Sequence, residues 1–108
     1  MVLIPKSAKV PTLYQSEDKT IDQQKVWVKL FNPMGSQTWY ITAFDPCTNE
    51  AFGFVNLGDA EMAELGYISI TELERLVLPW GMKIERDINF TPMPLREVMD
   101  TIKGGGHI

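Results

Sequence analysis

The sequence predicts an α+β fold, in which a mostly antiparallel sheet of four to five strands carries two to three packed helices. Short runs of β-branched and aromatic residues, separated by turn residues, are typical of antiparallel strands. Two further segments combine a helical apolar period with helix-start signals. The hydrophobic content of 44% in 108 residues indicates one core. A chain of this length removes roughly 65% of its unfolded surface from water on folding, which suffices for one domain.

Five short runs provide the predicted strands. They are VWVKLF at 26–31, TWYITAFD at 38–45, AFGFVN at 51–56, GYISI at 66–70 and MKIERDINF at 82–90. The turn NPMGSQ separates the first two runs, and PCTNE between the second and third has the length of a hairpin turn. Gly53 lies inside the third run, where a glycine indicates a bulge or a close approach of another backbone.

The first predicted helix begins at Ile70. Ser69 and Glu72 fit the S-x-x-E capping box, in which hydroxyl and carboxylate satisfy each other's free main-chain N–H groups. Glu72 is therefore assigned a structural role, and Glu74 points away from the apolar stripe and is free to meet a partner. Pro79 ends this helix, and its buried stripe is expected to contain Ile70, Leu73, Leu76 and Val77.

The second predicted helix spans about residues 94–103. Pro94 suits a first turn and Gly104 a stop, and the expected buried stripe contains Leu95, Val98, Met99 and Ile102. We therefore expect residues 1–103 to form a single globular domain and residues 104–108, GGGHI, to form a flexible tail.

Composition also limits the cellular compartment in which the protein is expected. Cys47 is the single cysteine, so an intrachain disulfide is excluded. The segment 1–11 is interrupted by Pro5 and Pro11 and lacks the long apolar core of a signal peptide. No apolar run approaches the roughly 20 residues that a membrane span needs. We expect a cytoplasmic protein with no membrane association.

Charge is distributed unevenly. The net charge is −4, yet residues 45–74 contain seven acidic residues and no lysine or arginine. We expect this segment to form an acidic face. Phosphate would be repelled there, so direct binding of nucleic acid is not expected.

Residues for nucleophilic or phosphate chemistry are sparse. His107 is the only histidine and lies in the glycine-rich tail, so Cys47 has no structured base to activate it. The glycines of the tail precede no helix and cannot form a phosphate loop. No cofactor is expected, and an enzymatic role is left open with non-enzymatic binding favoured.

A group of carboxylates offers an alternative, metal-dependent route to an enzymatic role. Glu85 and Asp87 share one face of the last predicted strand, and with Glu64 they could hold Mg²⁺ or Mn²⁺ in a small hydrolase or nuclease. Arg86 points to the opposite, apolar face and needs a carboxylate partner, for which Asp45 or Glu64 is expected.

Aromatic residues are expected mostly in the core, Trp80 included. Strand alternation nevertheless sends Trp39 and Tyr40 to opposite faces of the sheet. At least one of the two is therefore expected to be exposed, as an anchor for a partner.

Several motifs, in this order, resemble a small bacterial family of unknown function: TWY before an acidic turn, FGFV, ELGYISITEL and ERD. The resemblance covers roughly residues 10–100. It implies carriage on conjugative plasmids, phages and integrated elements, and no established reaction. The family's recurrent positions correspond here to Trp39, Tyr40, Asp45, Gly53, Glu64, Gly66, Tyr67, Glu72, Arg86 and Asp87.

The leading hypothesis is a non-enzymatic protein that binds a larger host protein or nucleoprotein complex with a basic surface, as an anti-restriction or anti-CRISPR protein would. Its expected contact residues are Trp39, Tyr40, Asp45, Asp59, Glu61, Glu64, Tyr67 and Glu74, supported structurally by Gly53, Gly66, Ser69, Glu72 and Arg86. A homodimer is also conceivable if the run at 26–31 is an edge strand, although Lys29 would weaken that pairing.

Overall fold

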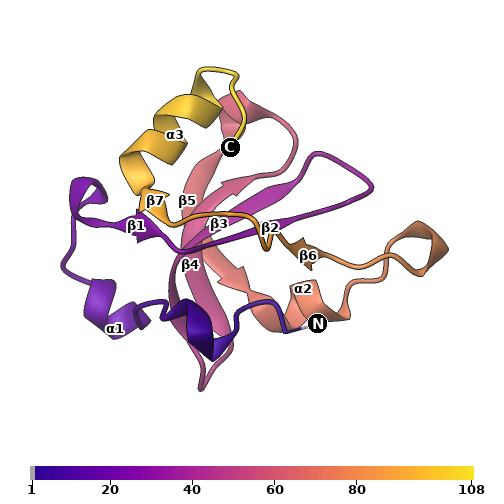
Figure 1. Ribbon diagram of the computed structural model, residues 1–108, viewed down its shortest axis with the longest axis horizontal. Coiled ribbons are helices and arrows are strands. Elements are labelled where there is room, and N and C mark those ends of the chain that lie inside the picture. Colours follow the sequence, from indigo (N-terminus) through magenta and orange to yellow (C-terminus); the bar gives the residue numbers. More distant parts are fainter. Residues whose placement is uncertain (1) are drawn as a thin grey trace.

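A five-stranded antiparallel sheet with the order β5-β4-β3-β2-β6 forms the centre of the fold (Figure 1). The structure is a computed structural model that describes residues 2–108. The strands are β2 (Val28–Phe31), β3 (Thr38–Asp45), β4 (Glu50–Asn56), β5 (Glu64–Ser69) and β6 (Glu85–Arg86). A separate antiparallel pair joins β1 (Lys25–Val26) to β7 (Met93–Pro94). The predicted α+β class is confirmed.

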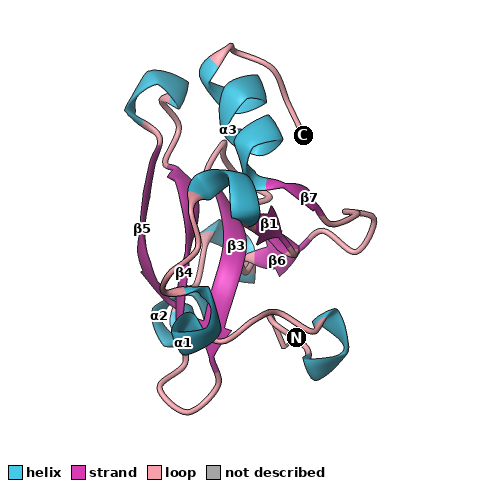
Figure 2. Cartoon of the chain, turned by 90° about the vertical axis from the view of Figure 1, so that its left-hand side faces the viewer, coloured by secondary structure: helices cyan, strands magenta, loops and turns pink. Residues whose placement is uncertain are grey.

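Three α-helices pack around the sheet. They are α1 (Leu13–Ser16), α2 (Ile70–Arg75) and α3 (Leu95–Lys103), and short 3-10 turns occur at η1 (Lys6–Ala8), η2 (Ile21–Gln23), η3 (Ala60–Met62) and η4 (Pro79–Gly81). In Figure 2, α3 lies at one end of the sheet, and α1 and α2 lie at the other. None of the helices in the described residues has the length and apolar character needed to cross a membrane.

Both faces of the sheet carry a hydrophobic core. Under α3, the core contains Val26, Tyr40, Phe54, Ala63, Leu95, Val98 and Ile102. On the opposite face, the N-terminal segment and α2 cover a second core of Leu3, Ile4, Val28, Leu30, Trp39, Ile41, Ala51, Ile68, Ile70 and Ile84. Strand alternation explains the division, because successive side chains of β3 point to opposite faces.

A bulge in β3 fixes how the central strands meet. The register of β3 against β4 shifts between Ile41 and Ala43. Thr42 is buried there, and its hydroxyl donates a hydrogen bond to the carbonyl oxygen of Phe52 at 3.0 Å. The backbone of Tyr40 comes so close to Gly53 that no side chain would fit. The sequence-based prediction of a close approach at Gly53 is confirmed.

Two of the predicted strands are shorter in the structure. The run 26–31 is divided at Trp27, whose N–H donates to the carbonyl oxygen of Ile41 at 2.9 Å, while β1 turns away to pair with β7. The run 82–90 keeps only β6. There the Asp87 carboxylate accepts a hydrogen bond from the Asn89 N–H at 2.9 Å, which turns the chain and leaves Ile88 exposed.

Helix α2 begins where predicted and ends early. Ser69 Oγ accepts a hydrogen bond from the Glu72 N–H at 3.2 Å, which is one half of the predicted capping box. The prediction that Leu76 and Val77 continue the buried stripe is wrong, because Leu76 is already extended, with ψ 125°, and both side chains are exposed. The chain leaves the helix there to enter the turn around Pro79.

The glycine-rich tail follows a defined path back toward the sheet. The Gly106 N–H donates to the carbonyl oxygen of Thr101 at 2.9 Å, and Lys29 Nζ donates to the main-chain oxygen of Ile108 at 2.6 Å. The side chain of Ile108 packs against the core under α3.

Candidate protein-binding surface

Strand β5 is the open edge of the sheet. In the part of the chain that the structure describes, it pairs with β4 on one side only. Its sequence, ELGYIS, contains neither lysine nor proline, and its register with β4 is continuous. Natural edge strands are usually protected by such residues or by bulges. The expectation that residues 26–31 form an unpaired edge strand is wrong, because β2 lies between β3 and β6.

The direction of the free main-chain groups follows from one hydrogen bond. The Ile70 N–H donates to the carbonyl oxygen of Asn49 at 3.0 Å, in line with the β4·β5 register. Hydrogen-bonding direction alternates along an antiparallel strand. The N–H and C=O groups of Leu65 and Tyr67 therefore point away from β4, toward the open side of β5.

A groove of about 600 Å³ lies beside this edge, between β5 and the segment containing α1 and η2, and its lining is mixed, with Glu17 and Lys19 among the polar residues. We call it the α1–β5 groove. Phe52, Leu65 and Tyr67 line it from the sheet, with the rings of Phe52 and Tyr67 edge to face at 5.1 Å. Leu13 and Tyr14 line it from α1. Tyr67 is 71% exposed and Tyr14 85%, so aromatic surface is open to solvent on both walls.

The seven carboxylates of residues 45–74 form two groups, where a single acidic face was expected. Residues Val55 and Glu64 pair at one end of β4 and β5, and Glu50 and Ser69 pair at the other. The two ends are about 17 Å apart at the usual rise of a strand. The N-end carboxylates are Asp59, Glu61 and Glu64, and the C-end carboxylates are Asp45, Glu50, Glu72 and Glu74.

These carboxylates are without ion-pair partners among residues 2–108, where the ion pairs are Lys29 with Asp87 and Arg96 with Asp22. Three accept hydrogen bonds. Asp45 accepts from the Cys47 N–H at 2.9 Å, Asp59 from the Glu61 N–H at 3.0 Å, and Glu74 from Asn49 Nδ2 at 3.3 Å. Carboxylates thus lie at both ends of β5, with Lys103 Nζ 3.4 Å from the main-chain oxygen of Glu61 and Lys83 Nζ 3.0 Å from that of Glu74.

Trp39 and Tyr40 are not available to a partner, contrary to expectation. They do point to opposite faces, but their exposed fractions are only 8% and 1%. Both faces of the sheet are covered, which local alternation could not reveal. Burial raises the pKa of Tyr40, the nearby Thr38 hydroxyl opposes this effect, and the charge of Asp87 adds to it.

The alternative metal site is not assembled. Glu64 lies on β5, and Glu85 and Asp87 lie at the opposite edge of the sheet, four strand spacings or about 19 Å away. Asp87 is paired with Lys29 at 3.7 Å. Across the described residues, no group of three or more histidine, cysteine, aspartate or glutamate side chains could hold a metal ion.

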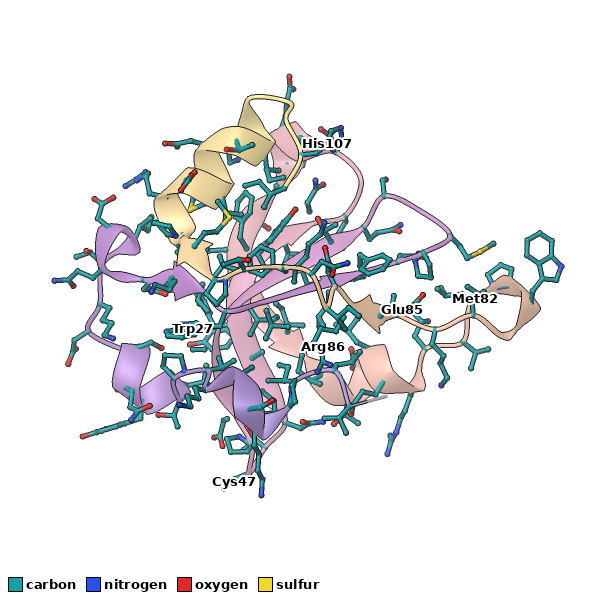
Figure 3. All side chains as sticks on the ribbon, viewed as in Figure 1. Trp27, Cys47, Met82, Glu85, Arg86 and His107 are labelled. Carbon is teal, nitrogen blue, oxygen red and sulfur yellow. The ribbon has the colours of Figure 1, made fainter. Side chains whose placement is uncertain are left out.

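Arg86 also departs from expectation. Its Nη1 donates to the main-chain oxygen of Val2 at 3.3 Å, and neither Asp45 nor Glu64 reaches it. The sheet order explains the error, because Glu64 lies at the far edge. Figure 3 labels Glu85 and Arg86 at the β6 edge, and shows Cys47 and His107 at opposite ends of the molecule. Cys47 and His107 are both exposed.

Trp80 was expected in the core, yet it is 89% exposed in the loop between α2 and β6. The string PWG at 79–81 was the available signal, because proline and glycine flanking one residue favour a tight surface turn.

A family model described as "Protein of unknown function (DUF2958)" matches residues 6–108. No curated protein and no solved structure is significantly similar to the chain.

Proposed function

The chain belongs to the DUF2958 family of proteins of unknown function, and we propose that it is a protein-binding module whose β5 edge accepts an extended, basic segment of a larger partner. The observation that carries the proposal is the open edge of β5 between two groups of unpaired carboxylates. Addition of a strand to a sheet edge is a recurrent way to bind an extended peptide.

Main-chain hydrogen bonds would supply part of the affinity. Leu65 and Tyr67 direct their N–H and C=O groups outward, so an antiparallel segment can form hydrogen-bonded pairs with both. The adjoining α1–β5 groove would take the partner's side chains at alternate positions, because residues that face Phe52, Leu65 and Tyr67 lie on one side of the extended sheet.

Charge favours a basic partner over a second copy of the chain. In an antiparallel pair of β5 strands, the N-end carboxylates of one copy would lie beside the C-end carboxylates of the other. In a parallel pair, like groups would lie together as well. Like charges placed side by side disfavour association, whereas lysines or arginines at both ends of a partner segment would speed encounter and fix its orientation.

The partner class follows from the sequence resemblance to passengers of mobile elements. We propose that the partner is a component of a host defence system that handles nucleic acid, in which surfaces that bind phosphate are basic. Binding of a small acidic protein near such a surface would inhibit or modulate the system. The protein would then be an anti-restriction or anti-CRISPR protein.

Co-purification from host cells tests the proposal with two sets of variants. Tyr67→Pro removes an outward N–H and should release the partner while leaving β4 pairing intact, because proline is tolerated where an edge N–H faces solvent. Tyr67→Ala is the matched control, since it removes the same side chain and keeps the N–H. Reversal of Glu61 and Glu64 to lysine should also weaken capture. An unchanged set of partners with Tyr67→Pro and with the reversed charges would refute the proposal.

A further inference from the structure

A cavity of about 400 Å³ lies between the β2–β3 hairpin and the C-terminal segment 105–108, which turns back from α3 (Figure 1). We call it the Lys29 cavity. Its lining is mixed, with Phe31 and Ile102 among the apolar residues and Ser36 and Asn56 among the polar ones. A cavity of this size and character is typical of sites for small molecules, which combine apolar walls with a few polar groups.

Lys29 determines the charge of this cavity. It is the only lysine or arginine in the lining, and none of the lining residues that the structure describes is an aspartate or glutamate. The side chain is largely buried, and its Nζ lies 2.6 Å from the main-chain oxygen of Ile108 and 3.7 Å from Asp87 Oδ2. Asp87 is not part of the lining, so the cavity contains a cation and no facing carboxylate. An oxygen acceptor or an anion is therefore favoured inside it, and a cation is disfavoured.

Thr38 contributes a buried hydroxyl to the same cavity. Its Oγ1 has no hydrogen-bond partner within residues 2–108. Thr38 and Tyr40 share one face of β3, and Tyr40 is paired with Lys29 on β2, so the hydroxyl and the ammonium lie on the same face of neighbouring strands. An unpaired buried hydroxyl lowers the free energy of unfolding, and such groups are rare in native proteins. A ligand that accepts a hydrogen bond from Thr38 would remove this cost.

We infer that the Lys29 cavity binds a small organic acid, whose carboxylate accepts hydrogen bonds from Lys29 Nζ and Thr38 Oγ1. The main-chain oxygen of Ile108 already accepts one hydrogen bond from Lys29, so this ammonium is oriented to donate to oxygen acceptors beside the C-terminal segment. The hydroxyl of Ser36 and the amide of Asn56 would bind a hydroxyl or carbonyl group elsewhere on the acid.

The number of donors favours a monocarboxylate over a phosphate. Phosphate sites usually contain arginine side chains or several main-chain N–H groups at a helix N-terminus. This cavity provides a single ammonium, which is already shared with Asp87. Tyr40 adds no negative charge, because burial raises its pKa and keeps the phenol protonated at neutral pH. One negative charge on the ligand therefore matches the cavity.

Amide chemical shifts measured by two-dimensional NMR test whether acids bind here. Acetate, lactate and 3-hydroxybutyrate are titrated separately into the full chain. Lactamide serves as the neutral analogue of lactate, and inorganic phosphate as the competing anion. We expect the acids to shift the signals of Ser36 in the hairpin and Gly105 in the C-terminal segment. Lactamide and phosphate should leave both signals unchanged.

Substitutions of the two donors test the assigned contacts. Lys29→Met and Thr38→Val should each weaken binding of the acids by about tenfold or more, the usual effect of losing a hydrogen bond to a charged group. Thr38→Ser keeps the hydroxyl and should retain binding. Thr91→Val, at an exposed position, is the matched control and should have no effect.

Stability gives a second measurement that needs no ligand. Valine has nearly the shape of threonine without the hydroxyl, so Thr38→Val removes an unsatisfied polar group from the interior. The midpoint of urea unfolding should therefore not fall in this variant, although its binding of acids is weakened.

Three results would overturn the inference. The first is the absence of shifts with all three acids. The second is equal affinity for lactate and lactamide, or for lactate and phosphate. The third is a lower urea midpoint for Thr38→Val than for Thr91→Val, which would show that the Thr38 hydroxyl is satisfied within the fold. The inference does not rest on the β5 proposal, because the cavity contains no residue of β5 and acid binding is measured without a partner.

Discussion

Gly53 on β4 lies directly against the main-chain carbonyl of Tyr40 on β3, and a Cβ atom at residue 53 would collide with that oxygen. The bulge between Ile41 and Ala43 lies next to this close approach, since Ile41 is the residue paired with Gly53. The two central strands can therefore keep their register only if residue 53 has no side chain.

Gly53→Ala should destabilise the protein by about 3 kcal/mol or more, because backbone rather than a flexible side chain must move. Urea unfolding followed by circular dichroism gives the free energy of unfolding. Gly66→Ala is the matched control, since Gly66 pairs with Gly53 across the strands and has no atom within 4 Å of the position of its Cβ. That control should change stability by no more than about 0.5 kcal/mol. Equal effects of the two substitutions would contradict the prediction.

Trp80→Gly should stabilise the isolated protein by about 1 kcal/mol, because glycine adopts the left-handed conformation without the steric penalty of other residues. Thermal or urea unfolding measures the change. The contrasting variant is Trp39→Phe, which removes part of a buried side chain and should destabilise. Loss of stability in Trp80→Gly would show that the indole packs within this molecule.

Stability should fall as the pH rises above about 10, because the pKa of Tyr40 is raised above its unfolded value of 10.0. Between the two pKa values the folded state holds a proton that the unfolded state has lost. The free energy of unfolding therefore decreases with pH, by at most about 1.4 kcal/mol per pH unit for one group, and below the unfolded pKa the contribution is complete.

Urea unfolding at pH 8 to 11 tests this with Tyr40→Phe, which should flatten the decrease. Tyr14→Phe removes an exposed phenol and should not. Identical pH profiles for the wild type and Tyr40→Phe would assign the decrease to other groups.

Ser69→Ala should cost about 1 kcal/mol, because the hydroxyl satisfies the Glu72 N–H at the start of α2. Glu72→Gln should cost less than about 0.5 kcal/mol, since the described residues show only the serine half of the capping box. Chemical denaturation compares the two. A larger cost for Glu72→Gln would mean that its carboxylate does reach the Ser69 N–H in solution.

The features that the sequence predicted well depend on local rules. The β3 boundaries, the glycine at the close approach and the first residue of α2 follow from alternation, turn chemistry and capping, which act over a few residues. Tyr67 was expected at the binding surface and is exposed beside the groove, but its contact with a partner stays a prediction.

The errors concern relationships between distant segments. Trp39 and Tyr40 are buried because α3 covers one face of the sheet while α2 and the N-terminal segment cover the other. The carboxylates divide into two groups because the β4·β5 register separates them by the length of a strand. Trp80 is exposed because the chain turns back between α2 and β6. The first two arrangements are not encoded within a local window of sequence, whereas the string PWG at 79–81 was a local signal for the third.

The order of strands also sets the distance between the two exposed borders of the sheet. β5 is one border of the sheet and the loop that carries Trp80 extends beyond the other. Molecules bound at these two places would be separated by at least the width of the sheet, about 19 Å at the usual strand spacing. The central sheet, braced on both sides, would then set their separation.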